Sequence, residues 1–266
     1  MGQASARIQK RRQAKNIIAK LMDQSDQVIV IHYSCESFYN RVDGPSPRIT
    51  SIAVRHLDSG QTRSFSIHQM AERKGHDMAG LEEYYALLER LMLDEFFEFV
   101  KTHSNYKWLH WNMRDSKYGF QAIAHRYRTL KGKPIEFDNS KLFDLPRFIH
   151  NLYGPNYIGH PRLASIVKKN QITDLDFLDG KEEAQAFEER QYVKLHHSTL
   201  RKVDVIATII EHVENGTLKT NSSWKDSYGN YPQAIVEIFQ EKWWIVAIIA
   251  LIGIISDVLG LFNLWP

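Results

Sequence analysis

The sequence predicts an α/β protein in which helices flank a mixed sheet and a single membrane-spanning helix follows at the C-terminus. Three observations support this prediction. Residues 27–68 have the pattern of three short strands joined by turns, helix and strand patterns alternate between residues 81 and 214, and residues 243–265 are almost uniformly apolar. The 266 residues are enough for one sizeable domain and an appendage.

The N-terminal segment, residues 1–26, is predicted to be a basic helix. Six Lys and Arg residues and no acidic residue lie between Arg7 and Lys20. Such a helix is either solvated or in contact with nucleic acid or anionic lipid, and the net charge of +3 does not decide between these roles. Cys35 is the only cysteine, which excludes an internal disulfide and favours a reducing compartment.

Residues 27–68 are expected to form a β-meander. Residues 28–33 are an apolar run with β-branched side chains, residues 49–57 alternate, and residues 63–67 are long enough for a third strand. Gly and Pro residues supply the turns between them. Glu36 follows the apolar part of the first strand, where many α/β enzymes place a metal-binding carboxylate.

The rest of the domain is predicted to alternate helices with short strands. Apolar residues at helical spacing, separated by charged ones, indicate the helices, and Asp144 with Pro146 is typical of a helix start. This order assigns residues 27–214 to one α/β domain and the residues after it, 215–240, to a linker that begins polar and rich in helix breakers. The predicted helices are 81–102, 118–130, 144–153, 160–169, 181–195 and 198–214, and the predicted strands are 106–111 and 135–137.

Residues 241–266 are predicted to form a membrane anchor, with the main domain in the cytoplasm. The apolar stretch contains one charged residue, Asp257, and at about 1.5 Å per residue it can cross a hydrocarbon core of about 30 Å. Tryptophans at both ends suit the two interfaces. A buried core helix is the alternative. Asp257 lies either near the far headgroups or, with Gly253 and Gly260 on one helical face, in a contact that makes a homo-oligomer through this helix.

Three short motifs with acidic or histidine residues follow one another along the domain. The first is Ser34-Cys35-Glu36 at the end of the first strand. The second, which reads His-Trp-Asn-Met-Arg-Asp, runs from His110 to Asp115 before a helix. The third begins at His197 before the last predicted helix.

The motifs and the order of the elements resemble the DEDDh 3′–5′ exonucleases, a branch of the ribonuclease H-like superfamily. In that family the first strand carries Asp-x-Glu, the second motif is roughly His-Asn-x-x-Phe-Asp, and a His precedes an Asp by five residues near the last helix. The resemblance implies a ribonuclease H-like sheet, four acids that hold two Mg²⁺ or Mn²⁺ ions, and a histidine that activates the attacking water. It covers about residues 27–214 and rests more on element order than on motif identity.

The motifs match this pattern only in part. Ser34 stands in place of the first Asp, and Lys202 stands five residues after the histidine, where the family has its last Asp. Asp204 is the nearest acid, seven residues after that histidine. The resemblance therefore implies catalytic roles for Glu36, Asp115 and His197, metal binding by Glu36, Asp115 and Asp204, and substrate binding by Ser34, His110, Asn112 and Lys202.

Each of these residues also has an ordinary structural interpretation. His110 suits a strand, Glu36 a turn, Asp115 a helix cap, and His197 a helix start. Two functions follow from the pattern. The chain is either a membrane-tethered module that binds a nucleic acid or nucleotide with weak or no hydrolysis, which suits a sensor or effector in bacterial defence, or an active metal-dependent 3′–5′ exonuclease. The missing acids favour the first, because removing half the negative charge weakens a two-metal site. A scaffold for a partner protein is a third, weaker interpretation.

Overall fold

A five-stranded mixed sheet lies at the centre of the part of the chain that the computed structural model describes, residues 3–36, 46–77, 80–223, 226–227 and 251. The strand order is β3-β2-β1-β4-β5, with β1–β2 and β2–β3 antiparallel and β1–β4 and β4–β5 parallel. This order is compatible with a ribonuclease H-like fold. The strands are β1 (Val28–Cys35), β2 (Ile49–His56), β3 (Thr62–Ser66), β4 (Lys107–His110) and β5 (Leu142–Asp144).

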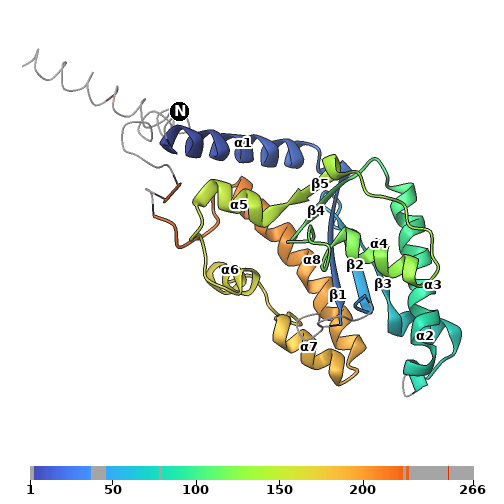
Figure 1. Cartoon of the computed structure of the whole chain (residues 1–266). Helices are drawn as coiled ribbons and strands as arrows, with labels where there is room; N and C mark the ends of the chain where they lie inside the picture. Colours follow the sequence, from blue (N-terminus) through green and yellow to red (C-terminus); the bar gives the residue numbers. More distant parts are fainter. Residues whose placement is uncertain (1–2, 37–45, 78–79, 224–225, 228–250, 252–266) are drawn as a thin grey trace, which may run out of the picture.

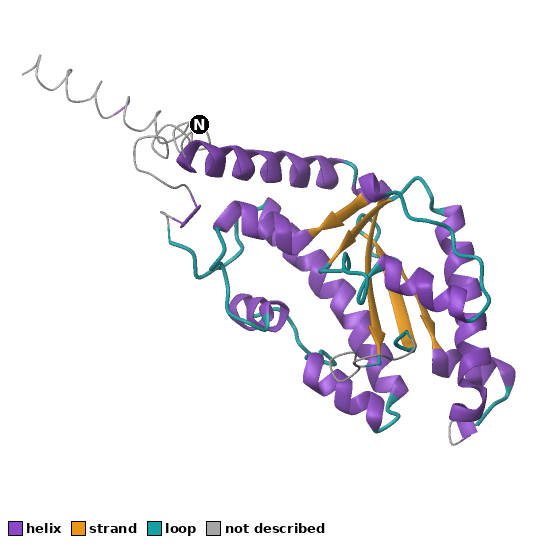
Figure 2. Cartoon of the chain, in the orientation of Figure 1, coloured by secondary structure: helices purple, strands orange, loops and turns teal. Residues whose placement is uncertain are grey.

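Helices cover both faces of this sheet, so the described part of the chain has three layers (Figures 1 and 2). The core on one face joins α2, α3 and α4 to alternate residues of β1 such as Ile29 and Ile31, and the core on the other face joins α1, α5, α6 and α8 to Val28 and Val30. The helices are α1 (Gln3–Asp23), α2 (Ile67–Lys74), α3 (Leu81–Thr102), α4 (Phe120–Thr129), α5 (Leu145–Tyr153), α6 (Arg162–Asn170), α7 (Gly180–Glu188) and α8 (Tyr192–Glu214), with short 3-10 turns η1 (Ser25–Gln27) and η3 (Asn139–Lys141).

The basic helix α1 is packed against the domain beside α5 (Figure 1). Its apolar residues Ala14, Ile18 and Leu21 are buried. Two of its cations contact the last turn of α5: an Arg7 guanidinium N–H donates to the carbonyl oxygen of Asn151 at 2.6 Å, and Arg11 donates to that of Leu152 at 3.0 Å. Cations suit this position because the last carbonyls of a helix lack intrahelical partners.

The structure differs from the predicted elements at three places. The last strand is residues 142–144 instead of 135–137, and the unforeseen helix α2 follows β3 directly. The predicted helix 181–195 divides into α7 and the start of α8, because Arg190 takes a left-handed conformation with φ 57°. Most other boundaries agree closely, and α3 has the predicted bounds.

The predicted membrane segment, residues 241–266, lies outside the described residues apart from Leu251. In the described part of the chain, no helix combines the length and the apolar character that spanning a bilayer requires. The anchor and the oligomeric contact at Asp257 therefore stay predictions from the sequence.

Candidate functional site

A cavity of about 380 Å³ opens where β1 extends beyond β4. β1 supplies His32 and Ser34 to its walls, Glu36 follows β1 directly, α7 supplies Glu183, and α8 supplies Lys202. The loop after β4 and the start of α6 complete the cavity. A volume in the range of small-molecule sites, at the carboxyl end of a central strand, is typical of ligand binding in α/β proteins.

The alternation of β1 explains why polar side chains line this cavity. Val28 and Val30 pack in the core beneath α8, and the next residues on that face of the strand are His32 and Ser34. The face that is apolar in the first half of the strand thus becomes polar in the second half. The end of β1 therefore cannot be packed like the remainder of the strand, and its polar groups need partners.

Glu183 provides a partner for both Ser34 and Lys202. The Ser34 hydroxyl donates to Glu183 Oε1 at 2.7 Å, and Lys202 Nζ lies 2.7 Å from the same oxygen. The Ser198 hydroxyl donates to it at 3.2 Å. Lys202 is only 5% exposed, so its ammonium is almost fully removed from water and needs this carboxylate. The cluster joins β1, α7 and α8, and it brings Ser34 and Lys202 to the same carboxylate oxygen.

Sequence reasoning missed Glu183, although it is the centre of this cluster. It lies beside Glu182, which forms a capping box with Asp179 at the start of α7: Asp179 accepts from the backbone N–H of Glu182, and its own N–H donates to Glu182. Two adjacent glutamates in a first turn have the same sequence signature. Only the fold shows that Glu183 is directed towards α8.

His32 lines the cavity without a hydrogen-bond partner for its ring nitrogens in the described part of the chain. It is 5% exposed, and both ring nitrogens are buried without a hydrogen bond within the described part of the chain. Burial, with a smaller contribution from the charge of Lys202, lowers the pKa of His32 well below its ordinary value. The imidazole is therefore neutral at pH 7, with one N–H donor and one acceptor buried in the wall of a ligand-sized cavity.

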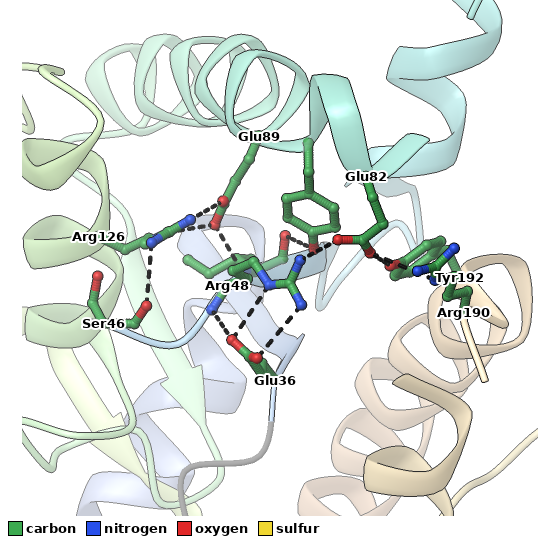
Figure 3. A network of polar contacts seen from close by, with 10 residues as sticks. Glu36, Ser46, Arg48, Glu82, Glu89, Arg126, Arg190 and Tyr192 are labelled. Atoms are coloured by element: carbon green, nitrogen blue, oxygen red, sulfur yellow. Dashed lines mark hydrogen bonds and ion pairs between the residues drawn. The ribbon is translucent and has the colours of Figure 1, made fainter. Parts of the chain in front are cut away.

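Glu36 is engaged by an arginine at the edge of the same cavity (Figure 3). The backbone N–H and the guanidinium of Arg48 donate to the Glu36 carboxylate at 3.3 to 3.5 Å. Arg48 in turn pairs with Glu82 at 2.7 Å, and the Tyr192 hydroxyl donates to Glu82. Glu36 thus belongs to a chain of charges that links the end of β1 to α3 and α8.

The second motif is divided between the cavity and the outside of the loop after β4. Asn112 lines the cavity, whereas His110 is buried beneath it and accepts the Met113 N–H at Nδ1 at 3.1 Å. Burial, followed by the charge of Arg114, lowers the pKa of His110 to about 3. Asp115 is exposed in a turn, where it accepts the Lys117 N–H at 2.8 Å. The structure therefore gives His110 and Asp115 structural contacts outside the cavity.

The third motif is divided in the same way. Lys202 lies in the cavity, but His197 is exposed in the second turn of α8, and a surface pocket beside Arg190 and Lys194 includes it. Asp204 lies beyond the cavity and pairs with Arg55 at 3.2 Å. Of the predicted site residues, the structure brings Ser34, Glu36, Asn112 and Lys202 to one cavity and leaves His110, Asp115, His197 and Asp204 outside it.

The described residues do not fit a two-metal centre. Glu36, Asp115 and Asp204 are not gathered, and no group of three or more His, Cys, Asp or Glu side chains in the described ranges could hold an ion. The positions that the resemblance assigns to the first and last Asp carry a hydroxyl and an ammonium that share Glu183. The three expected ligands Glu36, Asp115 and Asp204 thus lie apart in the described structure, and metal binding by this chain stays a prediction from the sequence.

Comparison with known proteins does not add to this picture. No family model matches the chain, and a comparison with curated proteins finds no significant match. The geometry of the cavity is therefore the basis for inferring the function of the chain.

Proposed function

We propose that residues 27–214 form a ribonuclease H-like module of the exonuclease type that binds a nucleic acid or nucleotide with weak or no hydrolysis. In this proposal residues 241–266 attach the module to a membrane, and ligand binding is a signal in a sensor or effector of bacterial defence. The observation that carries the proposal is the contact of both Ser34 and Lys202 with one oxygen of Glu183 in the cavity.

Lys202 supports binding without metal because its ammonium supplies a fixed positive charge. An ammonium carries one charge and donates in three directions, so it can contact Glu183 and a ligand phosphate together. It does not polarise a water molecule as a divalent cation does. A site built around Lys202 therefore holds a phosphate without generating the hydroxide that phosphodiester hydrolysis needs.

The remaining walls of the cavity suit the other parts of a nucleotide. Trp111 and Tyr118 provide aromatic surface at one side, and the neutral ring of His32 lies in the wall beside them. Arg162 and His160 lie at the start of α6, within reach of a phosphate in the cavity. These groups support a nucleotide unit over a purely apolar ligand.

The proposal is tested by incubating the full-length chain, in mild detergent, with 5′-labelled single-stranded DNA or RNA and with Mg²⁺, Mn²⁺ or EDTA. Retention and shortening of the label are followed together. We expect retention that survives EDTA, no shortening, and at least tenfold weaker retention by Lys202→Ala. Lys194→Ala, an exposed lysine in the first turn of the same helix, is the matched control.

Two results would contradict the proposal. Metal-dependent shortening that is abolished by Glu36→Ala or Asp115→Ala would establish the alternative function, an active exonuclease. Absence of retention by the wild-type chain would remove nucleic-acid binding altogether. Neither result needs Lys202→Ala, so both hold even if that variant, which leaves Glu183 without its cation, fails to fold.

A further inference from the structure

A second depression, with a volume of about 480 Å³, lies between α1, α5 and the start of α6. We call it the basic groove, and its charged residues are Lys10, Arg114, Arg147 and Arg162. His150 and polar Asn side chains also line it. No Asp or Glu of the described chain is among its lining residues. A concave surface with four cations and no lining acid attracts polyanions.

The buried Asp144 neutralises part of this positive charge. It pairs with Arg114 at 3.2 Å, and the charge of Arg147 also acts on it. One carboxylate thus faces two of the four cations, and Lys10 and Arg147 are exposed. The groove therefore keeps an excess of positive charge that the packing of the domain does not require.

The structure also separates the cations of α1 into two roles. Arg7 and Arg11 are bound to the carbonyls at the end of α5 and hold the helix in place. Lys10, between them in sequence, lines the groove. The cations of α1 thus have two roles. Arg7 and Arg11 attach the helix to α5, whereas Lys10 adds positive charge to the groove.

The basic groove adjoins the cavity. Arg162 and Asn112 line both of them, so a chain molecule that passes over these two residues extends from the cavity to the groove. Arg162 Nε is buried and has no hydrogen-bond partner in the described part of the chain. The two depressions thus lie side by side, one lined by aromatic and polar groups and the other by cations.

We propose that the basic groove binds the sugar–phosphate backbone of a single nucleic-acid strand whose terminal nucleotide lies in the cavity. This inference rests on the proposed function and deepens it, because it makes the ligand a polynucleotide and not a free nucleotide. Backbone phosphates beyond the terminal one contact Arg162, then Arg147 and Lys10. The combination of aromatic surface and a cationic track is the usual means of binding single strands without sequence preference.

The experiment compares ligands of increasing length on the full-length chain. The ligands are thymidine monophosphate, oligothymidylates of two, four, six and twelve nucleotides, and the corresponding uridylates, each in EDTA. We expect wild-type affinity to rise at least tenfold from one nucleotide to six. Arg147→Glu and Lys10→Glu should reduce this ratio of affinities towards one, and Lys194→Glu, with the same charge change outside the groove, should retain it.

Salt dependence gives an independent readout. Each phosphate contact on a single strand adds about 0.7 to the slope of log affinity against log salt concentration, because a counterion is released. Arg147→Glu should therefore make the salt dependence for the six-nucleotide ligand less steep, with a decrease of about 0.7 or more in the magnitude of the slope. Glu is accepted in the first turn of α5, so this substitution suits the helix.

Several results would overturn the inference. Affinity that does not grow with length, or an equal loss in Lys194→Glu, would remove the groove as a backbone site. Vesicles of phosphatidylserine that bind the wild-type chain and not Arg147→Glu, with unchanged oligonucleotide affinity, would assign the charge to a membrane surface. If the monophosphate binds and length has no effect, only this inference fails; if no nucleotide ligand binds, the proposed function fails as well.

Discussion

The buried ion pair between Glu89 and Arg126 connects the start of β2 to α3 and α4 (Figure 3). Arg126 donates to both carboxylate oxygens, at 2.9 and 2.6 Å, and Glu89 is fully buried. Glu89 also accepts the Ile49 N–H at 2.7 Å. Burial raises the pKa of Glu89 although Arg126 opposes this. Such a pair is costly to break because the remaining charge stays buried without its partner.

Replacing Arg126 by Met should therefore lower the free energy of unfolding by about 3–5 kcal/mol, measured by urea denaturation. Adding Glu89→Gln should recover part of this loss, since Gln removes the charge and still accepts the Ile49 N–H. Arg128→Met is the control, because Arg128 is exposed and its pair with Glu136 contributes at most about 1 kcal/mol. Equal losses for Arg126→Met and Arg128→Met would contradict the interpretation.

Buried histidines make the stability of the protein depend on pH. The rings of His196 and His68 lie 4.9 Å apart, and burial, with the charges of His68 and His197, lowers the pKa of His196 to about 4. In the unfolded chain a histidine binds its proton near pH 6.5, whereas folded His196 binds it near pH 4. Between these values the unfolded state binds more protons than the folded state. The contribution of His196 to the free energy of unfolding is therefore fully present above about pH 6.5 and is lost as the pH is lowered.

Replacing His196 by Leu should remove this contribution. The difference in unfolding free energy between pH 7 and pH 5 should shrink by roughly 1–2 kcal/mol, since each pH unit contributes up to about 1.4 kcal/mol per group. Urea denaturation at the two pH values measures it. His125→Gln, at an exposed position of α4, should leave the difference unchanged. An unaltered difference in His196→Leu would contradict the role of burial.

At the scale of elements, the end of α7 sets the position of α8 and thus of Lys202. The Gln191 N–H donates to the carbonyl of Ala186 at 2.8 Å, and the Arg190 N–H donates to that of Phe187 at 3.0 Å. Together with φ 57° at Arg190, these bonds form a Schellman motif. The residue in the left-handed position of this motif is usually Gly, because a side chain there costs roughly 1 kcal/mol.

Arg190→Gly should therefore raise the free energy of unfolding by about 0.5–1 kcal/mol. Little is lost with the side chain, since its 4.0 Å contact with Glu82 is largely exposed. Glu188→Gly, at the last residue of α7, should instead cost about 1 kcal/mol, because Gly weakens a helix. Thermal unfolding of the three proteins measures both effects, and destabilisation by Arg190→Gly would show that the turn has another origin.

The same motif explains what sequence patterns can and cannot predict here. β1, β2 and α3 were predicted within two residues, because each is long enough to show its periodicity. The break before α8 was missed because Arg190 stands where Gly would signal it, and β5, with three residues, is too short for any pattern. In the site, Ser34 and Lys202 were found by their place in a motif, whereas Glu183 has no local mark that separates it from Glu182.

At the scale of the whole molecule, the site depends on three distant parts of the chain. Ser34 lies next to the last residue of β1, Glu183 lies in the first turn of α7, and Lys202 lies in the middle of α8. Each element is held by the apolar packing of the sheet and its two helical layers. Ser34 and Lys202 stand where the exonuclease pattern has aspartates, and they reach one carboxylate only when the whole domain is folded. Replacing both by aspartate therefore tests whether the cavity can be converted into a metal site.

The variant Ser34→Asp with Lys202→Asp should gain a binding site for Mn²⁺. The ammonium of Lys202 now lies 2.7 Å from Glu183 Oε1. An aspartate at position 202 is shorter, and a cation about 2.1 Å from its oxygen would lie near the present ammonium, between three carboxylates. Without metal these carboxylates repel one another, so the melting temperature should fall below the wild-type value and rise again with Mn²⁺.

The matched control is Ser34→Asn with Lys202→Asn, which has the same shape and no added negative charge. Isothermal titration calorimetry should show at least tenfold tighter Mn²⁺ binding by the aspartate variant than by this control or the wild-type chain. Equal binding by all three would mean that the side chains at positions 34 and 202 do not converge as the structure indicates. Because the readout is metal affinity, the result is independent of whether the wild-type cavity binds a nucleic acid, and it tests the geometry on which both proposals stand.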